Sequence, residues 1–192
     1  FIELAEETGL IAAIGDWALQ EACTTVARWP GELKIAVNLS AVQFKRERLL
    51  QGIEAALRAS RLAPERLELE ITESLLLETN ETVRSVLDQI HDLGASIALD
   101  DFGTGYSSLS YLQSFPFDRI KIDRSFIRNC GSDQRSIDIV SSIVGMAKVL
   151  GMVVVAEGVE TAEQRDIIRD CGCHQYQGYF FSRPRPAAEI EA

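Results

Sequence analysis

The chain has 192 residues, of which 46% are hydrophobic and 25% are charged, and its formal net charge is −10 at pH 7. The acidic balance argues against DNA or RNA as the main ligand, because binding to a polyanion needs clustered Lys and Arg. A small phosphorylated ligand remains compatible with it, since divalent cations held by carboxylates supply positive charge locally. No apolar run approaches the length of a membrane span and no signal-peptide pattern opens the chain, so we expect no membrane contact and a cytoplasmic location.

Strand-like and helix-like segments alternate along the chain. Residues 9–29 carry apolar side chains at helical spacing and predict a helix, and the residues from Phe1 onward resemble the start of a helix cut from something longer. The predicted strands cover residues 33–39, 66–72, 95–100, 118–122, 152–157 and 174–177. The further predicted helices cover residues 46–60, 81–93, 107–113, 133–150 and 161–170, with a helical turn after Pro186. This alternation predicts a parallel sheet with helices packed outside it.

Five of the strand-like segments end in polar residues suited to a metal or phosphate site. These residues are Asn38, Glu70, the pair Asp100 and Asp101, Lys121, and Glu157. In four of the five segments the strongly apolar residues share one parity and the polar residue takes the other, as with Val37 and Leu39 around Asn38. Because successive residues of a strand face opposite sides, these polar side chains would converge at one end of a parallel sheet.

Polar residues that recur at strand after strand favour a TIM-type (β/α) barrel, whose active site is built around the carboxyl ends of the strands. A doubly wound open sheet would more often show near-continuous apolar strands and one Gly-rich loop. A barrel has eight strands and about 250 residues, whereas six strands are predicted here. We therefore expect residues 1–192 to be a single domain that is incomplete at its N-terminus.

Several of these residues have a second interpretation. Asp100 and Asp101 suit a site that bridges two divalent cations, or an Asp-rich turn with glycines after it. Glu70 suits a metal ligand or the solvated face of an edge strand. Asn38 suits a neutral oxygen ligand or a hydrogen-bonded buried amide. Lys121 suits a structural counter-ion, or a group that orients water or stabilises phosphate charge.

The remaining polar candidates follow strands late in the chain. Glu157 suits a ligand or a general base, whereas Glu160 better suits a residue that caps or braces a loop. Carboxylates, an amide and a lysine together favour metal-assisted hydrolysis of a phosphodiester. An enolase-type reaction, in which a lysine abstracts a proton beside bound magnesium, remains open on these residues alone.

The four cysteines are scattered apart from the Cys-Gly-Cys-His run at residues 171–174. A zinc site would need a second pair of ligands at suitable spacing, which the sequence lacks. We expect this run to be a helix end that leads into a buried strand, in a reducing cytoplasm.

Six motifs occur in the order and spacing of one bacterial signalling family. They are Asn-Leu-Ser at 38–40, Glu-Leu-Glu-Ile-Thr-Glu-Ser at 68–74, Asp-Asp-Phe-Gly-Thr-Gly-Tyr-Ser-Ser-Leu at 100–109, Lys-Ile-Asp at 121–123, Ala-Glu-Gly-Val-Glu at 156–160 and Gln-Gly-Tyr at 177–179. With them the chain resembles the EAL-domain cyclic di-GMP phosphodiesterases, from Phe1 to about Pro186. The Glu-Ala-Leu motif that names this family is absent, and the two strands missing by count are those that would carry it.

The resemblance implies a TIM-type barrel that hydrolyses cyclic di-GMP to linear pGpG with Mg²⁺ or Mn²⁺, bound as two ions. It implies that Asn38, Glu70 and Asp100 are ligands of the first metal and that Asp101 is a ligand of the second. The other implied roles are water binding and activation by Lys121 and Glu157, completion of the site by Gln177, a guanine contact by Pro184, and bracing of the 101–109 loop by Glu73 and Glu160.

The resemblance also implies partners. They are cyclic di-GMP, a second copy of the domain in a homodimer, and sensory or cyclase domains upstream in the full-length protein. The alternative function is a catalytically silent receptor for cyclic di-GMP, although such relatives usually have decayed acidic motifs and those present here are intact.

Overall fold

The structure is a computed structural model, which describes residues 1–44, 48–73, 75, 81–105 and 109–190. Its strands follow one another in sheet order as they do in sequence, β1-β2-β3-β4-β5-β6. They are β1 (Ile35–Leu39), β2 (Leu67–Thr72), β3 (Ser96–Phe102), β4 (Arg119–Ile122), β5 (Val153–Ala156) and β6 (Gln175–Tyr176). The pairings of β1 with β2, of β4 with β5 and of β5 with β6 are all parallel, which confirms the predicted type of sheet.

Helices alternate with the strands along the chain, as the sequence pattern predicts. They are α1 (Ile2–Glu7), α2 (Ile11–Val26), α3 (Ala41–Phe44), α4 (Leu49–Ser60), α6 (Glu81–Asp92), α7 (Leu109–Ser114), α8 (Arg124–Asn129), α9 (Gln134–Val149), α10 (Ala162–Asp170) and α11 (Ala187–Ile190), with a 3₁₀ turn η1 (Pro64–Arg66) before β2. Among the described residues, none of these helices combines the length and the apolar character that a membrane span requires.

The sequence predicts all six strands and the longer helices, but it does not predict the short helices α3 and α8. The predicted helix 9–29 corresponds to α2, and a separate helix α1 precedes it, because Gly9 with φ +74° breaks the helical path between them. Helix α8 was not predicted at all, since six residues show no clear helical period. Parts of two predicted helices, residues 46–47 and 107–108, lie outside the described residues.

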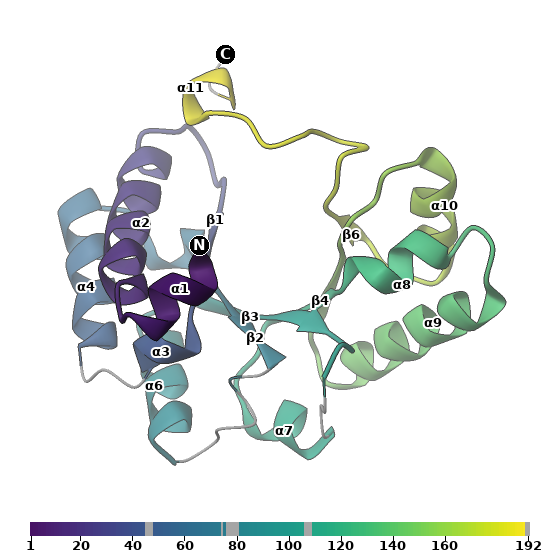
Figure 1. Ribbon diagram of the computed structural model, residues 1–192, viewed down its shortest axis with the longest axis horizontal. Coiled ribbons are helices and arrows are strands. Elements are labelled where there is room, and N and C mark those ends of the chain that lie inside the picture. Colours follow the sequence, from purple (N-terminus) through teal and green to yellow (C-terminus); the bar gives the residue numbers. More distant parts are fainter. Residues whose placement is uncertain (45–47, 74, 76–80, 106–108, 191–192) are drawn as a thin grey trace. The chain divides into compact units, whose positions relative to one another are not determined.

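The chain divides within β3 into two compact units, Phe1–Ala98 and Leu99–Ala192. In the first unit, α2 and α4 lie side by side (Figure 1), and buried apolar side chains form the core. Strand β1 pairs with β2 so that Asn38 lies opposite Glu70. All of Leu67–Ile71 is buried, including Glu68 and Glu70, so both faces of β2 are covered.

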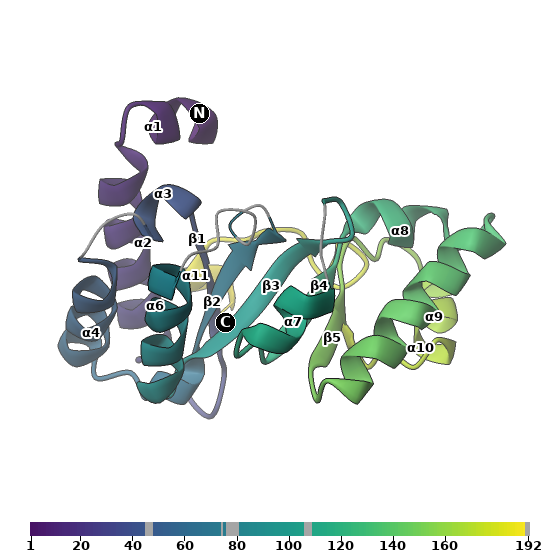
Figure 2. The ribbon, with the colours of Figure 1, turned by 90° about the horizontal axis from the view of Figure 1, so that it is seen from below.

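In the second unit, α8, α9 and α10 pack against one another (Figure 2). Each begins at a side-chain cap: Asp123 accepts a hydrogen bond from the Ser125 N–H and begins α8. Asp133 caps α9 in the same way, and Thr161 with Gln164 forms a capping box at α10. Such caps satisfy amide groups that the first turn of a helix leaves without partners, so these three starts are fixed by local sequence.

Arg66 ties the end of α2 to the segment before β1. Its Nε donates to the Leu33 carbonyl at 2.8 Å, and its Nη2 donates to the carbonyls of Val26 at 2.9 Å and Trp29 at 3.4 Å. We expect Arg66→Ala to lower the free energy of unfolding by about 1–3 kcal/mol, measured by urea denaturation. Arg66→Lys should not regain the free energy of unfolding of the parent, because an ammonium lacks the planar arrangement of donors that a guanidinium has.

The matched control is Arg58→Ala on the exposed face of α4, which should leave stability within about 0.5 kcal/mol. Equal stability of the Arg66→Ala variant and the parent would contradict this account of the segment.

The four cysteines are free, and Cys23, Cys130 and Cys173 are buried while Cys171 is half-buried. Burial raises the pKa of the Cys23 and Cys173 thiols, and burial with the nearby Cys171 and Asp133 raises the pKa of Cys130 to about 11. A raised thiol pKa leaves little of the reactive thiolate at pH 8.

A disulfide reagent such as Ellman's reagent should therefore label the folded protein at Cys171 first, with all four thiols reacting in urea. Cys171→Ser should remove the fast phase. Rapid labelling of two or more thiols in the folded protein would contradict the burial of the other three.

Candidate metal centre

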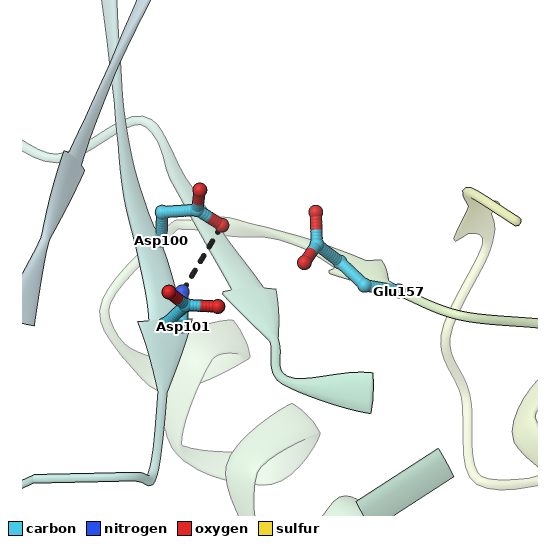
Figure 3. A group of neighbouring side chains, drawn as sticks. All are labelled: Asp100, Asp101 and Glu157. Atoms are coloured by element: carbon cyan, nitrogen blue, oxygen red, sulfur yellow. Dashed lines mark hydrogen bonds between the residues drawn. The ribbon is translucent and has the colours of Figure 1, made fainter. Parts of the chain in front are cut away.

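Three carboxylates from two strand ends lie together in the second unit. Asp100 and Asp101 belong to the end of β3, and Glu157 directly follows β5; one oxygen of each lies within 4.8 Å of the others (Figure 3). Hard divalent cations such as Mg²⁺, Mn²⁺ and Ca²⁺ are bound by carboxylate oxygens. The donor set therefore fits the type of cation that the sequence predicts.

The backbone at Asp101 explains how two adjacent residues reach one place. Alternation along a regular strand would send the two side chains to opposite faces. Asp101 instead has φ +53°, a left-handed conformation that is uncommon for residues other than glycine. Its N–H donates to Asp100 Oδ1 at 3.0 Å, the dashed line in Figure 3. Strained backbone of this kind persists where the surrounding structure holds it and is common at functional sites.

Lys121 on β4 lies between two of these carboxylates. Its Nζ is 3.0 Å from Asp100 Oδ1 and 2.7 Å from Glu157 Oε1, and the three side chains are only 4%, 12% and 16% exposed in the order Lys121, Asp100, Glu157. Ion pairs this well buried interact much more strongly than pairs in water. One ammonium against three carboxylates still leaves an excess of negative charge, which a cation would neutralise.

The surroundings of Asp101 change the pKa of its carboxyl group. Its pKa is raised, first by partial burial and then by the negative charges of Asp100 and Asp123, while Lys121 and Arg124 act in the opposite direction. A proton therefore stays on this carboxyl to a higher pH than on an ordinary aspartate. A bound cation would favour the ionised form, as metal ligands require.

Two further candidates, Asn38 and Glu70, lie in the first unit. They are register partners on β1 and β2, so their side chains project to the same face of this strand pair. Asn38 is exposed between the buried Val37 and Leu39, as its parity predicts. Glu70 is 6% exposed, which excludes the alternative of a solvated carboxylate on an edge strand.

The last strand brings Gln177 beside the segment that carries Glu157. The Gln177 N–H donates to the Ala156 carbonyl at 2.8 Å, and its own carbonyl accepts from the Val159 N–H at 3.0 Å. The Gln177 side chain is exposed, as is Pro184 further along the chain.

The two residues predicted to brace the 101–109 loop lie in different units. Glu73 is buried in the first unit, while Glu160 in the second is exposed and its N–H donates to Gln164 Oε1 at 2.8 Å. Residues 106–108 of that loop lie outside the described residues. The bracing roles therefore stay predictions.

The surroundings of α8 were not predicted from the sequence. Asp123 and Arg124 line a hollow of about 730 Å³ together with Ser125, Arg128, Asn129, Gly158 and Glu160. The signal that could have found this helix start was Asp123-Arg124-Ser125, an aspartate two residues before the N–H that it accepts from. Asp123 belongs to the Lys-Ile-Asp motif, in which the sequence pattern predicts a site role for Lys121 alone.

Comparisons with known proteins agree with the resemblance seen in the motifs. The sequence profile of the EAL domain family matches residues 1–184. The chain therefore belongs to the EAL domain family. The strand–helix alternation described above is accordingly that of the α/β, TIM-type barrel class that the sequence predicted.

Several characterised proteins are similar over most of the chain. The bifunctional diguanylate cyclase/cyclic di-GMP phosphodiesterase MucR of Pseudomonas aeruginosa is 42% identical over 100% of this chain and 29% of its own length. A solved complex of the MucR phosphodiesterase with cyclic di-GMP matches 99% of this chain and 78% of that chain with a TM-score of 0.95 and 42% identity. The manganese and cyclic di-GMP complex of Klebsiella pneumoniae BlrP1 matches 90% of this chain and 45% of that chain, with a TM-score of 0.84 and 32% identity. The chain spans less than a third of the length of MucR and similar curated relatives, between 23% and 29%.

Proposed function

We propose that this chain is the catalytic domain of a phosphodiesterase that hydrolyses cyclic di-GMP to linear pGpG with the help of divalent cations. The observation that carries the proposal is the group of three carboxylates around a buried lysine at the ends of β3, β4 and β5. Three relatives that are 39–42% identical to the whole chain are named as cyclic di-GMP phosphodiesterases, which supports the choice of substrate.

Mg²⁺ or Mn²⁺ fits the ligands that the chain offers, and we propose two ions. Asp100 and Asp101 would each hold one ion, with Asn38 and Glu70 as further oxygen ligands of the first, as the family resemblance implies. A solved relative with manganese and cyclic di-GMP supports this type of metal. When bound, divalent cations would neutralise the charge of the phosphodiester and make water a stronger nucleophile.

The chain's own residues would position and deprotonate the attacking water. Glu157 lies close enough to the aspartates to accept a proton from a water molecule held among them. Lys121 holds the Glu157 carboxylate in place and adds a positive charge where the phosphate develops negative charge. Gln177 would complete the site, and Pro184 would contact a guanine base.

The enolase-type alternative requires Lys121 to act as a base and therefore to be neutral. Contact with two carboxylates favours the charged ammonium instead. A charged Lys121 can orient and stabilise, but it cannot abstract a proton. This geometry favours hydrolysis over proton abstraction.

The remaining parts of the proposal concern the full-length protein. We propose a cytoplasmic signalling protein with sensory or cyclase domains upstream of this domain, because the curated relatives are several times longer than the matched segment. A homodimer, with Glu73 and Glu160 bracing the 101–109 loop, is part of the same proposal and rests on the family resemblance.

The test is a comparison of binding with cleavage in the full-length polypeptide. Cyclic di-GMP is incubated with the protein and Mg²⁺, the products are separated by chromatography, and the affinity for cyclic di-GMP is measured by calorimetry in parallel. We expect conversion to pGpG. Tight binding without conversion would replace the enzyme by a receptor, and the absence of both would remove cyclic di-GMP as the ligand.

A further inference from the structure

Helix α8 begins three residues after Lys121 and touches the loops that follow both carboxylate-bearing strands. Its first turn carries Arg124 and Phe126, and it starts at the capping residue Asp123. Two glycines, Gly103 and Gly158, lie against these side chains. The helix follows β4 directly and contacts the loops after β3 and β5, so it lies next to the strand ends that carry the polar residues.

The first contact joins Phe126 to the turn after Asp101. A β-carbon built on Gly103 would lie 2.7 Å from Phe126 Cε2 and 3.0 Å from Phe126 Cζ, so the edge of the ring lies directly against the glycine backbone. Gly103 has φ +97°, a conformation open to glycine and unfavourable for other residues. The ring occupies the space that a side chain would take.

The second contact joins Arg124 to the loop after Glu157. A β-carbon on Gly158 would lie 2.4 Å from Arg124 Cβ and 3.3 Å from Arg124 Cα, so the two backbones approach closely. The loop after Glu157 thus packs against the same helical turn as the loop after Asp101. The loops that follow Asp101 and Glu157 therefore both pack against the first turn of α8.

The backbone conformation of Asp101 is one that contacts with surrounding residues must stabilise. Asp101 is exposed and has φ +53°, whereas Asp100 beside it is buried. A left-handed conformation of a non-glycine residue costs free energy and persists only when the surroundings hold it. The two residues after it, Phe102 and Gly103, connect this strained position to the Phe126 ring.

We propose that Phe126 is a positioning residue of the metal centre: its ring, packed on Gly103, holds the turn in which Asp101 joins Asp100 and Glu157. The proposal rests on the proposed function, because it assigns these carboxylates to a divalent cation. Phe126 acts on the carboxylates only through the backbone of the turn.

The test is the affinity for Mn²⁺, measured by calorimetry on the metal-stripped full-length protein without substrate. Residues that orient metal ligands typically change affinity by about 10–100-fold when replaced. We expect Phe126→Ala to weaken Mn²⁺ binding about tenfold. Phe126→Leu keeps apolar bulk against Gly103 and should bind Mn²⁺ more tightly than Phe126→Ala. With saturating Mn²⁺, the turnover number of Phe126→Ala should return close to that of the parent.

Ile127→Val is the matched control, because Ile127 is the next residue of α8 and is fully buried. It should lower the melting temperature without changing the affinity for Mn²⁺. Gly103→Ala should also weaken Mn²⁺ binding, because the added β-carbon would overlap the Phe126 ring and displace the turn. The double variant Gly103→Ala with Phe126→Ala should lose less affinity than the sum of the two single losses, because removing the ring relieves the overlap.

Unchanged Mn²⁺ affinity in Phe126→Ala, an equal loss in Ile127→Val, or no Mn²⁺ binding by the parent would each overturn the positioning role. The proposed function fails separately, if the parent binds Mn²⁺ but does not cleave cyclic di-GMP. In that case the comparison of Mn²⁺ affinities still decides the role of Phe126.

Discussion

Replacing Lys121 by methionine is expected to lower the free energy of unfolding of the metal-free protein by about 3–5 kcal/mol at pH 7. The change removes the ammonium that contacts Asp100 and Glu157, and it leaves the buried Asp100 carboxylate beside the partly buried Glu157 carboxylate. Methionine has a similar length, so the loss comes from charge and not from a cavity. Urea denaturation in the presence of a chelator measures it.

Two further measurements distinguish the effect of the lost charge from an effect of changed packing in Lys121→Met. Mn²⁺ should restore part of the stability of Lys121→Met, because a cation replaces the missing positive charge. Lys148→Met, on the exposed side of α9, should change stability by less than about 0.5 kcal/mol. If Lys121→Met were as stable as the parent without metal, the two ion pairs would contribute little and the electrostatic description of the centre would be wrong.

Asp100→Asn is expected to reduce the turnover number for cyclic di-GMP by at least about 10²–10³-fold. The asparagine can still accept the hydrogen bond from the Asp101 N–H, but it loses the negative charge that faces Lys121 and the cation. Initial rates of pGpG formation with saturating Mg²⁺ measure the effect. Glu70→Gln should give a loss of the same order, because Glu70 is proposed as a ligand in the first unit.

Asp92→Asn at the exposed end of α6 serves as the control and should keep the activity of the parent. Near-normal turnover of Asp100→Asn or of Glu70→Gln would remove that residue from the set of metal ligands. Loss of activity in Asp92→Asn as well would indicate a general effect on folding or charge.

The strand ends could be predicted from the sequence because they depend on local patterns. Alternation of apolar and polar residues in 33–39 agrees with the burial pattern of β1, in which Asn38 is exposed between the buried Val37 and Leu39. The parallel order followed from the repeated strand–helix units. In parallel strands, equivalent ends meet at the same edge, so the sequence alone was enough to group Lys121 with Glu157.

The geometry of Asp101 could not be predicted in the same way. A regular strand would separate its side chain from that of Asp100, and only the positive φ angle lets both contribute to one group. Helix α8 was missed because its six residues are stabilised by a cap and by tertiary packing instead of a helical period. The close approach of Phe126 to Gly103 depends on residues more than 20 positions apart, which no local pattern reveals.

The initial rate of pGpG formation, measured as Mn²⁺ is added back to the metal-stripped full-length protein, tests the central claim most directly. We expect no hydrolysis of cyclic di-GMP without metal, a rate that rises to saturation with Mn²⁺, and full reversal by a chelator. Hydrolysis that is unaffected by the chelator, or a protein that stays inactive at every Mn²⁺ concentration, would contradict a metal-dependent phosphodiesterase built on Asp100, Asp101 and Glu157.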